Sequence, residues 1–223
     1  MQFIIKNFFV LLILFCFCQP DSTEKTNLIA ETDLKPSELE NWNANVPQNW
    51  ESIDIDAQTL YRLTPRAEPE YSIRRPQHTA IWTLYSVDNF KFVVKTKSRA
   101  DSLNPKRDIC LFFGYQDSLH FYYAHFSATS DKVHNIIGLV DNADRKKINL
   151  EPAGESTYRL DVTNWHTLSV VRNSDNGWIK AYIDDLETPV MTAKDTTFKK
   201  GFIGIGSFDD PVDFDQVKLY TFE

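Results

Sequence analysis

Short runs of hydrophobic or alternating residues recur along most of this chain, and turn-forming residues separate them. Eleven such runs follow one another: TLYRL, HTAIWTLY, FKFVVKTK, DICLFFGYQ, HFYYAHFS, HNIIGLV, WHTLSVVR, GWIKAYID, PVMTA, GFIGIGSF and FDQVKLYTF. Each has the length of a β-strand, and none keeps the period of a long amphipathic helix. Residues 173–177, NSDNG, predict a hairpin turn, because Asn and Gly tolerate positive φ. The pattern predicts an all-β sandwich or barrel, and we expect two antiparallel sheets.

The first residues follow a different pattern. Residues 1–17 carry Lys6 and then an apolar run from Phe8 to Phe17, and polar residues follow Cys18. This run is shorter than the roughly 18 to 20 apolar residues that span a bilayer, so it predicts a cleaved export signal. The ending resembles a bacterial lipoprotein signal, with Cys18 as the lipidated residue. Processing at Cys16 and a plain secretory signal are the alternatives.

Residues 18–49 are polar and lack a sustained apolar period, so they predict a flexible tether. The domain is then expected at residues 50–223, and this length suits a single all-β domain. We therefore expect an exported protein that is held at a bacterial membrane, on the outer membrane or its periplasmic face, through its N-terminal lipid alone.

The composition of the chain restricts the kinds of ligand that it can bind. The formal net charge is -7, which disfavours nucleic acid and means that an anionic ligand would need a locally basic site. Cys110 is the single cysteine outside the signal segment, so no disulfide can form within the domain. Stability must come from the hydrophobic core.

Residues 107–145 hold the densest group of potential acid, base and anion-binding side chains. Successive side chains of a strand point to opposite faces, so Phe121, Tyr123, His125 and Ser127 are expected to share one face of their strand. A phenol and an imidazole are then neighbours on one wall. Side chains that can transfer a proton or bind an anion lie nearby in sequence: Arg107, Gln116, His134, Asn135 and Arg145.

The last third of the chain resembles the concanavalin-A-like jelly roll. The resemblance rests on WHTLSVVRN, on GWIKAYIDDLETPVMTAKD and on the glycine-rich GFIGIGSFDDPVDFDQVKLY. This order is similar to that of laminin-G-type binding modules, 3-keto-disaccharide hydrolases and jelly-roll polysaccharide lyases. The resemblance implies the fold, and it specifies the function poorly.

The middle of the chain resembles a narrower group. RDICLFFGYQDSLHFYYAHFS and HNIIGLVDNADRKKI are similar to exported Bacteroidetes-type proteins of polysaccharide-degradation loci, which include an ulvan oligosaccharide dehydratase. This resemblance covers about residues 73–220. It implies a lyase or dehydratase of uronic-acid-containing oligosaccharides, without a cofactor. The C5 proton is removed, the C4 substituent leaves, and a 4,5-unsaturated uronate forms.

Such an elimination needs a base, an acid and a group that neutralises the sugar carboxylate. On the resemblance to jelly-roll lyases, we assign Tyr123 and His125 as the acid/base pair and His134 as a further catalytic candidate. The anion-binding candidates are polar or cationic residues, with the arginines able to meet a carboxylate through two hydrogen bonds. They are Arg145 and Asn135 first, Arg107 and Gln116 next, and Arg74 and Arg75 as a binding edge.

Two alternatives to this activity stay open: a glycan-binding lipoprotein that stacks sugars on aromatic side chains, and a hydrolase of 3-keto-glycosides. A retaining glycosidase is disfavoured, because the chain lacks the E-x-D-x-E type of strand that places two carboxylates about 5 to 5.5 Å apart. The acidic run SFDDPVDFD matches no EF-hand loop and is interpreted as a solvated turn. No metal site is therefore predicted.

Overall fold

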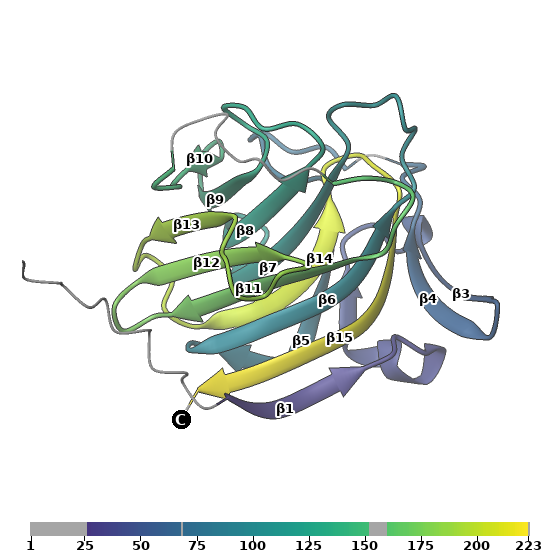
Figure 1. The fold of residues 1–223 in the computed structure, drawn as a ribbon, viewed down its shortest axis with the longest axis horizontal. Helices are drawn as coiled ribbons and strands as arrows, with labels where there is room; N and C mark the ends of the chain where they lie inside the picture. Colours follow the sequence, from purple (N-terminus) through teal and green to yellow (C-terminus); the bar gives the residue numbers. More distant parts are fainter. Residues whose placement is uncertain (1–25, 68, 152–159, 223) are drawn as a thin grey trace, which may run out of the picture.

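Two antiparallel β-sheets pack face to face in the computed structural model, which describes residues 26–67, 69–151 and 160–222 (Figure 1). One is an eight-stranded sheet and the other a seven-stranded sheet. In spatial order the eight-stranded sheet contains β13 (Met191–Lys194), β12 (Trp178–Ile183), β11 (His166–Asn173), β6 (Phe90–Ser98), β15 (Val212–Phe222), β4 (Gln58–Leu63) and β3 (Trp50–Ile55), with β1 (Thr26–Thr32) also paired to β15. The seven-stranded sheet contains β10 (Lys146–Lys147), β9 (Ile136–Asp141), β8 (His120–Ser127), β7 (Asp108–Asp117), β14 (Gly201–Ser207), β5 (His78–Val87) and β2 (Trp42–Ala44).

Each of the eleven predicted strands is found, and the predicted two-sheet antiparallel fold is confirmed. The predicted hairpin at residues 173–177 connects β11 to β12, with Asn173 opposite Trp178. Strands β1, β2, β3 and β10 were not predicted. They are short or polar edge strands, so their sequences carry little alternation.

The N-terminal boundary differs from the expected one. The structure places residues 26–49 within the sandwich: β1 lies along β15 and β2 pairs with β5 (Figure 1). The 3₁₀ helix η1 (Pro36–Asn41) connects β1 to β2, and a second, η2 (Pro47–Asn49), connects β2 to β3. Trp42 on β2 is buried and stacks on Trp82 with ring centroids 5.4 Å apart. The domain therefore begins well before residue 50. The expected signal segment and Cys18 lie outside the described residues.

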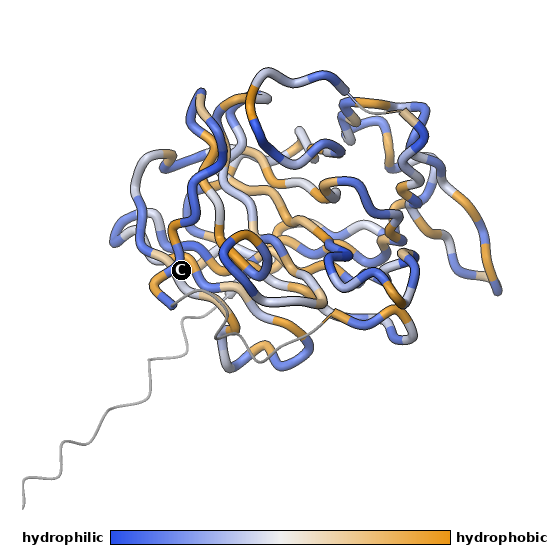
Figure 2. Tube along the Cα trace, turned by 90° about the horizontal axis from the view of Figure 1, so that it is seen from above, coloured by the Kyte–Doolittle hydropathy of each residue, from blue (hydrophilic) through white to orange (hydrophobic). Residues whose placement is uncertain are grey.

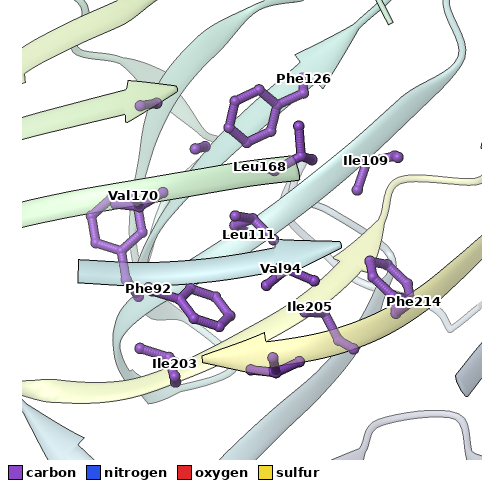
Figure 3. Packing of buried hydrophobic residues seen from close by; sticks show 14 of the residues in the cluster. Phe92, Val94, Ile109, Leu111, Phe126, Leu168, Val170, Ile203, Ile205 and Phe214 are labelled. Carbon is purple, nitrogen blue, oxygen red and sulfur yellow. The ribbon is translucent and has the colours of Figure 1, made fainter. Parts of the chain in front are cut away.

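The main core fills the space between the sheets. Figure 3 shows side chains from both sheets meeting there, among them Phe92, Leu168 and Phe214 from one sheet and Leu111 and Ile205 from the other. Side chains of this kind alternate with outward-facing ones along each strand, as a two-sheet sandwich requires. Hydrophobic and hydrophilic residues are interspersed along the chain (Figure 2). Among the described residues, no helix has the length and apolar character needed to cross a membrane.

A second hydrophobic cluster covers the outer face of the seven-stranded sheet. Its buried members include Cys110, Phe112, Phe121 and Tyr123, and Phe208 is one of the partly buried residues packed against them. Strand β8 is consequently buried on both faces along nearly its whole length. The outer face of this sheet therefore holds Tyr123 and its neighbour His125, the acid/base pair assigned in the sequence analysis.

Candidate functional site

Strand register brings the predicted residues together. In the seven-stranded sheet Cys110 on β7 lies opposite His125 on β8, and Tyr123 lies opposite Gly138 on β9. Tyr123 and His125 are two positions apart on β8, so their side chains share the outer face. Their ring centroids lie 6.4 Å apart. The predicted phenol–imidazole pair is therefore present on one wall.

His125 is 1% exposed, and each of its ring nitrogens faces an oxygen atom, with a hydrogen bond at Nδ1 alone. Its Nδ1 lies 2.9 Å from the backbone oxygen of Val133, and its Nε2 lies 3.1 Å from Oδ2 of Asp108. A carbonyl oxygen only accepts, so Nδ1 carries a hydrogen and donates it to Val133. Asp108 is itself buried at the start of β7. The imidazole is thus held rigidly against a carboxylate.

Tyr123 is completely buried, and within the described part of the chain its hydroxyl makes no hydrogen bond of regular geometry, although the Arg145 side chain lies beside it. Burial raises the pKa of this phenol well above its ordinary value, and the nearby Arg145 opposes the shift only in part. Tyr123 is therefore a neutral proton donor near pH 7. Phe208 covers both Tyr123 and His125, with ring centroids at 5.9 and 5.1 Å, so neither side chain lies open to a ligand.

His134 is the more accessible histidine of the cluster. Its side chain is 13% exposed, and its ring centroid lies 5.4 Å from that of His125. Its Nδ1 lies 2.8 Å from the carboxylate of Asp131. Although burial alone would raise the pKa of Asp131, hydrogen bonds from the backbone N–H of Val133 and from the His134 side chain lower it. A carboxylate on Nδ1 leaves Nε2 of His134 to accept a proton.

Arg145 forms the cationic side of the cluster. Its guanidinium carbon lies 4.3 Å above the centre of the Phe208 ring, in a cation–π contact. The backbone N–H of Arg145 donates to the backbone oxygen of Arg74 at 2.9 Å. The backbone N–H of Arg74 in turn donates to Asp144 at 2.8 Å. These hydrogen bonds place the exposed Arg74 beside the half-buried Arg145 at one rim of the site.

Two other predicted anion-binding residues, Asn135 and Arg107, form hydrogen bonds with backbone groups of this chain. Both functions of the Asn135 side-chain amide bond to backbone, with Oδ1 accepting from Ser127 and Nδ2 donating to Ser127 and Thr129. Asn135 also has a φ of 53°, a left-handed conformation that Asn tolerates better than most residues. The Arg107 guanidinium donates to the backbone oxygens of Ser102, Asn104 and Leu160. These bonds explain both side chains without a ligand.

Gln116 and Arg75 lie at the other end of the sheet. Gln116 is the next-to-last residue of β7, close to the β7–β8 turn, and donates to the backbone oxygens of Gly114 and Lys200. Arg75 is fully buried, with its guanidinium 3.9 Å from the Tyr71 ring and 5.2 Å from the Phe121 ring. Burial lowers the pKa of Arg75, because the charged form is desolvated. Neither residue joins the cluster around His125.

Sequence reasoning missed Asp108, Asp131 and Phe208 as members of the site. Asp131 could have been predicted from the sequence, because it precedes His134 by three residues. Asp108 and Phe208 meet through non-local pairing: Ser207 Oγ and the Phe208 N–H both donate to Asp108 Oδ1 at 2.9 Å. No local sequence signal reports a contact across about 100 residues.

Three of the four aspartates in the acidic run at residues 207–215 are buried and Asp209 alone is exposed, so the interpretation of the run as a solvated turn is wrong for most of it. Asp210, Asp213 and Asp215 are 7%, 5% and 2% exposed. Asp213 forms a two-point ion pair with Arg62, at 2.7 and 2.8 Å. Asp210 accepts from the backbone N–H of Asp108, and burial together with the charge of Asp108 raises its pKa to about 6. These carboxylates are structural partners of neighbouring strands.

The sheet arrangement defines the class of this protein as a concanavalin-A-like jelly-roll β-sandwich. No known family model matches the sequence, and no curated protein matches it. Among solved structures, the carbohydrate-binding module CBM66 from Bacillus subtilis is similar with a TM-score of 0.56 at 17% identity, covering 79% of this chain and 93% of the module.

Two enzymes of known structure are similar to a comparable degree. The β-glucanase of Bacillus licheniformis has a TM-score of 0.53 at 13% identity, covering 91% of this chain and 100% of the enzyme. A GH16 protein of a Bacteroides ovatus mixed-linkage glucan locus, solved with a product, has a TM-score of 0.54 at 9% identity, covering 86% and 96%. At these identities the similarity establishes the fold, and the predicted jelly roll is confirmed.

Proposed function

We propose that this protein acts on uronic-acid-containing oligosaccharides as a lyase or dehydratase, with its site at the rim formed by His134 and Arg145. One observation carries the proposal: four residues selected for this chemistry from the sequence lie together, with Tyr123, His125 and Arg145 around Phe208 and His134 packed against His125. The similar solved structures include a carbohydrate-binding module and glycan-processing enzymes, which agrees with a sugar ligand.

We assign each step of the reaction to a residue according to how exposed its side chain is. His134 is partly exposed and is oriented by Asp131, so it is the base that removes the C5 proton. Arg145 neutralises the sugar carboxylate, whose charge grows as the C5–H bond breaks. The carbanion-like intermediate then expels the C4 substituent, which takes a proton and leaves as water or as the next sugar. The product is the 4,5-unsaturated uronate.

Tyr123 supplies the proton to the C4 oxygen in this scheme. Its high pKa keeps it protonated, and among the described residues Arg145 is the side chain that lies close enough to influence its hydroxyl. Tyr123 is fully buried, so it reaches a sugar only when the partly exposed Phe208 ring moves aside. His125 lies behind His134 and is too buried to touch a sugar directly.

Turnover of oligouronates, followed by the ultraviolet absorbance of the unsaturated product, tests this function. His134→Ala and Tyr123→Phe should each lower the rate by about 10² to 10⁴-fold, the usual range for a positioned proton-transfer group. His120→Ala is the matched control, because His120 also pairs with an aspartate three residues earlier but lies at the turn between β7 and β8. Full activity in both test variants would refute the assignment of His134 and Tyr123 as the catalytic base and acid.

Substrate charge gives an independent test. Arg145→Lys keeps a positive charge but loses the planar fork, so it should weaken turnover, and Arg145→Ala should weaken it further. Oligosaccharide whose carboxyl groups have been reduced should be a poor substrate of the unmodified protein. Equal turnover of the reduced sugar would contradict the uronate mechanism.

Binding without catalysis is the second candidate function, and a feature of the other sheet favours it. A shallow groove on the outer face of the eight-stranded sheet is lined by Lys91, Lys95, Lys218 and Tyr220, among others. Lysines beside an aromatic ring suit an anionic glycan. If oligouronates bind and are released unchanged, and if Lys91→Gln weakens that binding while His134→Ala does not, the protein is a binding module.

A further inference from the structure

Three side chains with metal-ligating atoms meet below His134, and the proposed function uses none of them in contact with the sugar. Asp108, Cys110 and His125 are all buried, and one ligand atom from each lies within 4.8 Å of the others. Asp108 and Cys110 are two positions apart on β7, and Cys110 lies directly opposite His125 on β8. The sheet register therefore directs a carboxylate, a thiol and an imidazole to one point of the outer face.

The hydrogen bonding of His125 prepares it to bind a cation. Nδ1 donates to the Val133 carbonyl, so in the neutral ring Nε2 carries a lone pair. That lone pair lies 3.1 Å from Oδ2 of Asp108, yet Nε2 has no partner with hydrogen-bond geometry among the described residues. Two electron-rich atoms face each other at this distance in a buried site. A cation bound to both removes the repulsion.

Hydrogen bonds on its other oxygen likewise fix the orientation of the Asp108 carboxylate. Its Oδ1 accepts from Ser207 Oγ and from the Phe208 backbone N–H, each at 2.9 Å. The carboxylate is thus fixed, and Oδ2 is the oxygen that faces His125. Metal-binding histidines and carboxylates in proteins are commonly held by hydrogen bonds of this kind on their other atoms.

The charges of the ligand side chains would also balance the charge of a divalent ion. The ion would be neutralised by the Asp108 carboxylate and a Cys110 thiolate, leaving no net charge in a buried position. Arg145 acts against metal binding from one side, whereas Asp209 and Asp210 add negative charge near Asp108.

We propose that Asp108 Oδ2, Cys110 Sγ and His125 Nε2 form a Zn²⁺ site with three protein ligands and an open fourth position. A mixed sulfur, nitrogen and oxygen set suits Zn²⁺, and it suits neither Ca²⁺ nor Mg²⁺, which take oxygen ligands. Bond lengths of about 2.0 to 2.3 Å to a tetrahedral zinc place neighbouring ligand atoms roughly 3.3 to 3.8 Å apart. The three atoms are already within 4.8 Å, so small side-chain adjustments complete the geometry.

Metal content of the full chain tests the site without any sugar. The purified protein, dialysed against metal-free buffer after loading with ZnCl₂, should retain about one zinc per chain by inductively coupled plasma mass spectrometry. Loading with CoCl₂ instead should give a near-ultraviolet thiolate-to-cobalt band. The band should disappear in Cys110→Ser, and His125→Gln should weaken zinc affinity by at least about 100-fold, because it deletes a ligand rather than a supporting hydrogen bond.

Controls separate this site from other binders. Cys110→Ser leaves Cys16 and Cys18 unchanged, so a cobalt band that persists in this variant overturns the proposal. Asp209→Asn should keep the zinc, whereas loss of zinc there would assign binding to the neighbouring acidic group of Asp108, Asp209 and Asp210. Circular dichroism verifies the fold of each variant. For the unmodified protein, a retained zinc content below about 0.1 per chain and a melting temperature unmoved by Zn²⁺ would also refute the site.

Discussion

Gly138 and Tyr123 offer the sharpest test of how the candidate site is built. A methyl group on Gly138 would lie 2.3 Å from two atoms of the Tyr123 ring and 2.6 Å from its hydroxyl oxygen. Carbon atoms in contact are normally about 3.5 to 4.0 Å apart, so the ring would have to move by more than about 1 Å. Tyr123 is fully buried, with no free space to enter. Gly138→Ala should therefore lower the free energy of unfolding by about 1 to 3 kcal/mol, as overpacking does.

A double-mutant cycle measured by urea unfolding isolates this contact. Tyr123→Leu removes the ring atoms that the new methyl group meets, so Gly138→Ala should become nearly neutral in that background. Tyr123→Phe is the matched control, because it keeps the two clashing ring atoms and should keep most of the penalty. A coupling energy of about 1 to 3 kcal/mol is expected with Leu. Coupling below about 0.5 kcal/mol would mean that Tyr123 does not lie across Gly138.

Three further predictions concern stability. Trp42→Ala should cost about 3 to 5 kcal/mol in chemical unfolding, because its buried ring stacks on Trp82, whereas a residue in a tether would change stability by less than about 0.5 kcal/mol. Asp213→Ala should cost about 3 to 5 kcal/mol by leaving Arg62 without its two-point partner, and an effect below 1 kcal/mol would contradict a structural pair. The fold lowers the pKa of Asp131 below its ordinary 3.8, so its stabilisation is present above that pH and is lost as pH falls through the folded pKa. Unfolding of Asp131→Asn at pH 3 to 7 should show a stability deficit that shrinks toward the acid end, and a pH-independent deficit would refute this.

The strands could be predicted because their signal is local. Alternation along residues 120–127 defined which side chains share a face, and the structure places Tyr123 and His125 on the same face as predicted. Strand β1 gave no such signal, because its sequence TNLIAET is largely polar and it forms by pairing with β15 at the far end of the chain. A strand that depends on its partner rather than on its own alternation is invisible to periodicity.

The site could be predicted only in part, for a similar reason. Tyr123, His125, His134 and Arg145 lie within 23 positions, so their proximity followed from one hairpin and its neighbour. The burial of Tyr123 and His125 could not be predicted, because the residue that covers them, Phe208, follows β14 and is distant in sequence. Likewise, Asp108, Cys110 and His125 share no recognisable metal-binding spacing. Their ligand atoms meet because β7 and β8 pair in one register, and a shift by one residue would turn His125 to the core.

Recognition of an anionic sugar by an acidic protein requires positive charge that is local. The whole chain carries a net charge of -7, so its long-range field repels polyanions. The Arg74–Arg145 backbone hydrogen bond nevertheless joins two arginines from separate segments, and Lys146 and Lys147 follow at once in β10. This basic rim borders the cluster that contains His134. Asp144 and Asp131 lie at the same rim, so within about one Debye length, roughly 8 Å at physiological salt, an anionic sugar would be attracted through direct contact with the arginines. Salt should accordingly weaken binding at the rim, while repulsion by the rest of the surface keeps other polyanions away.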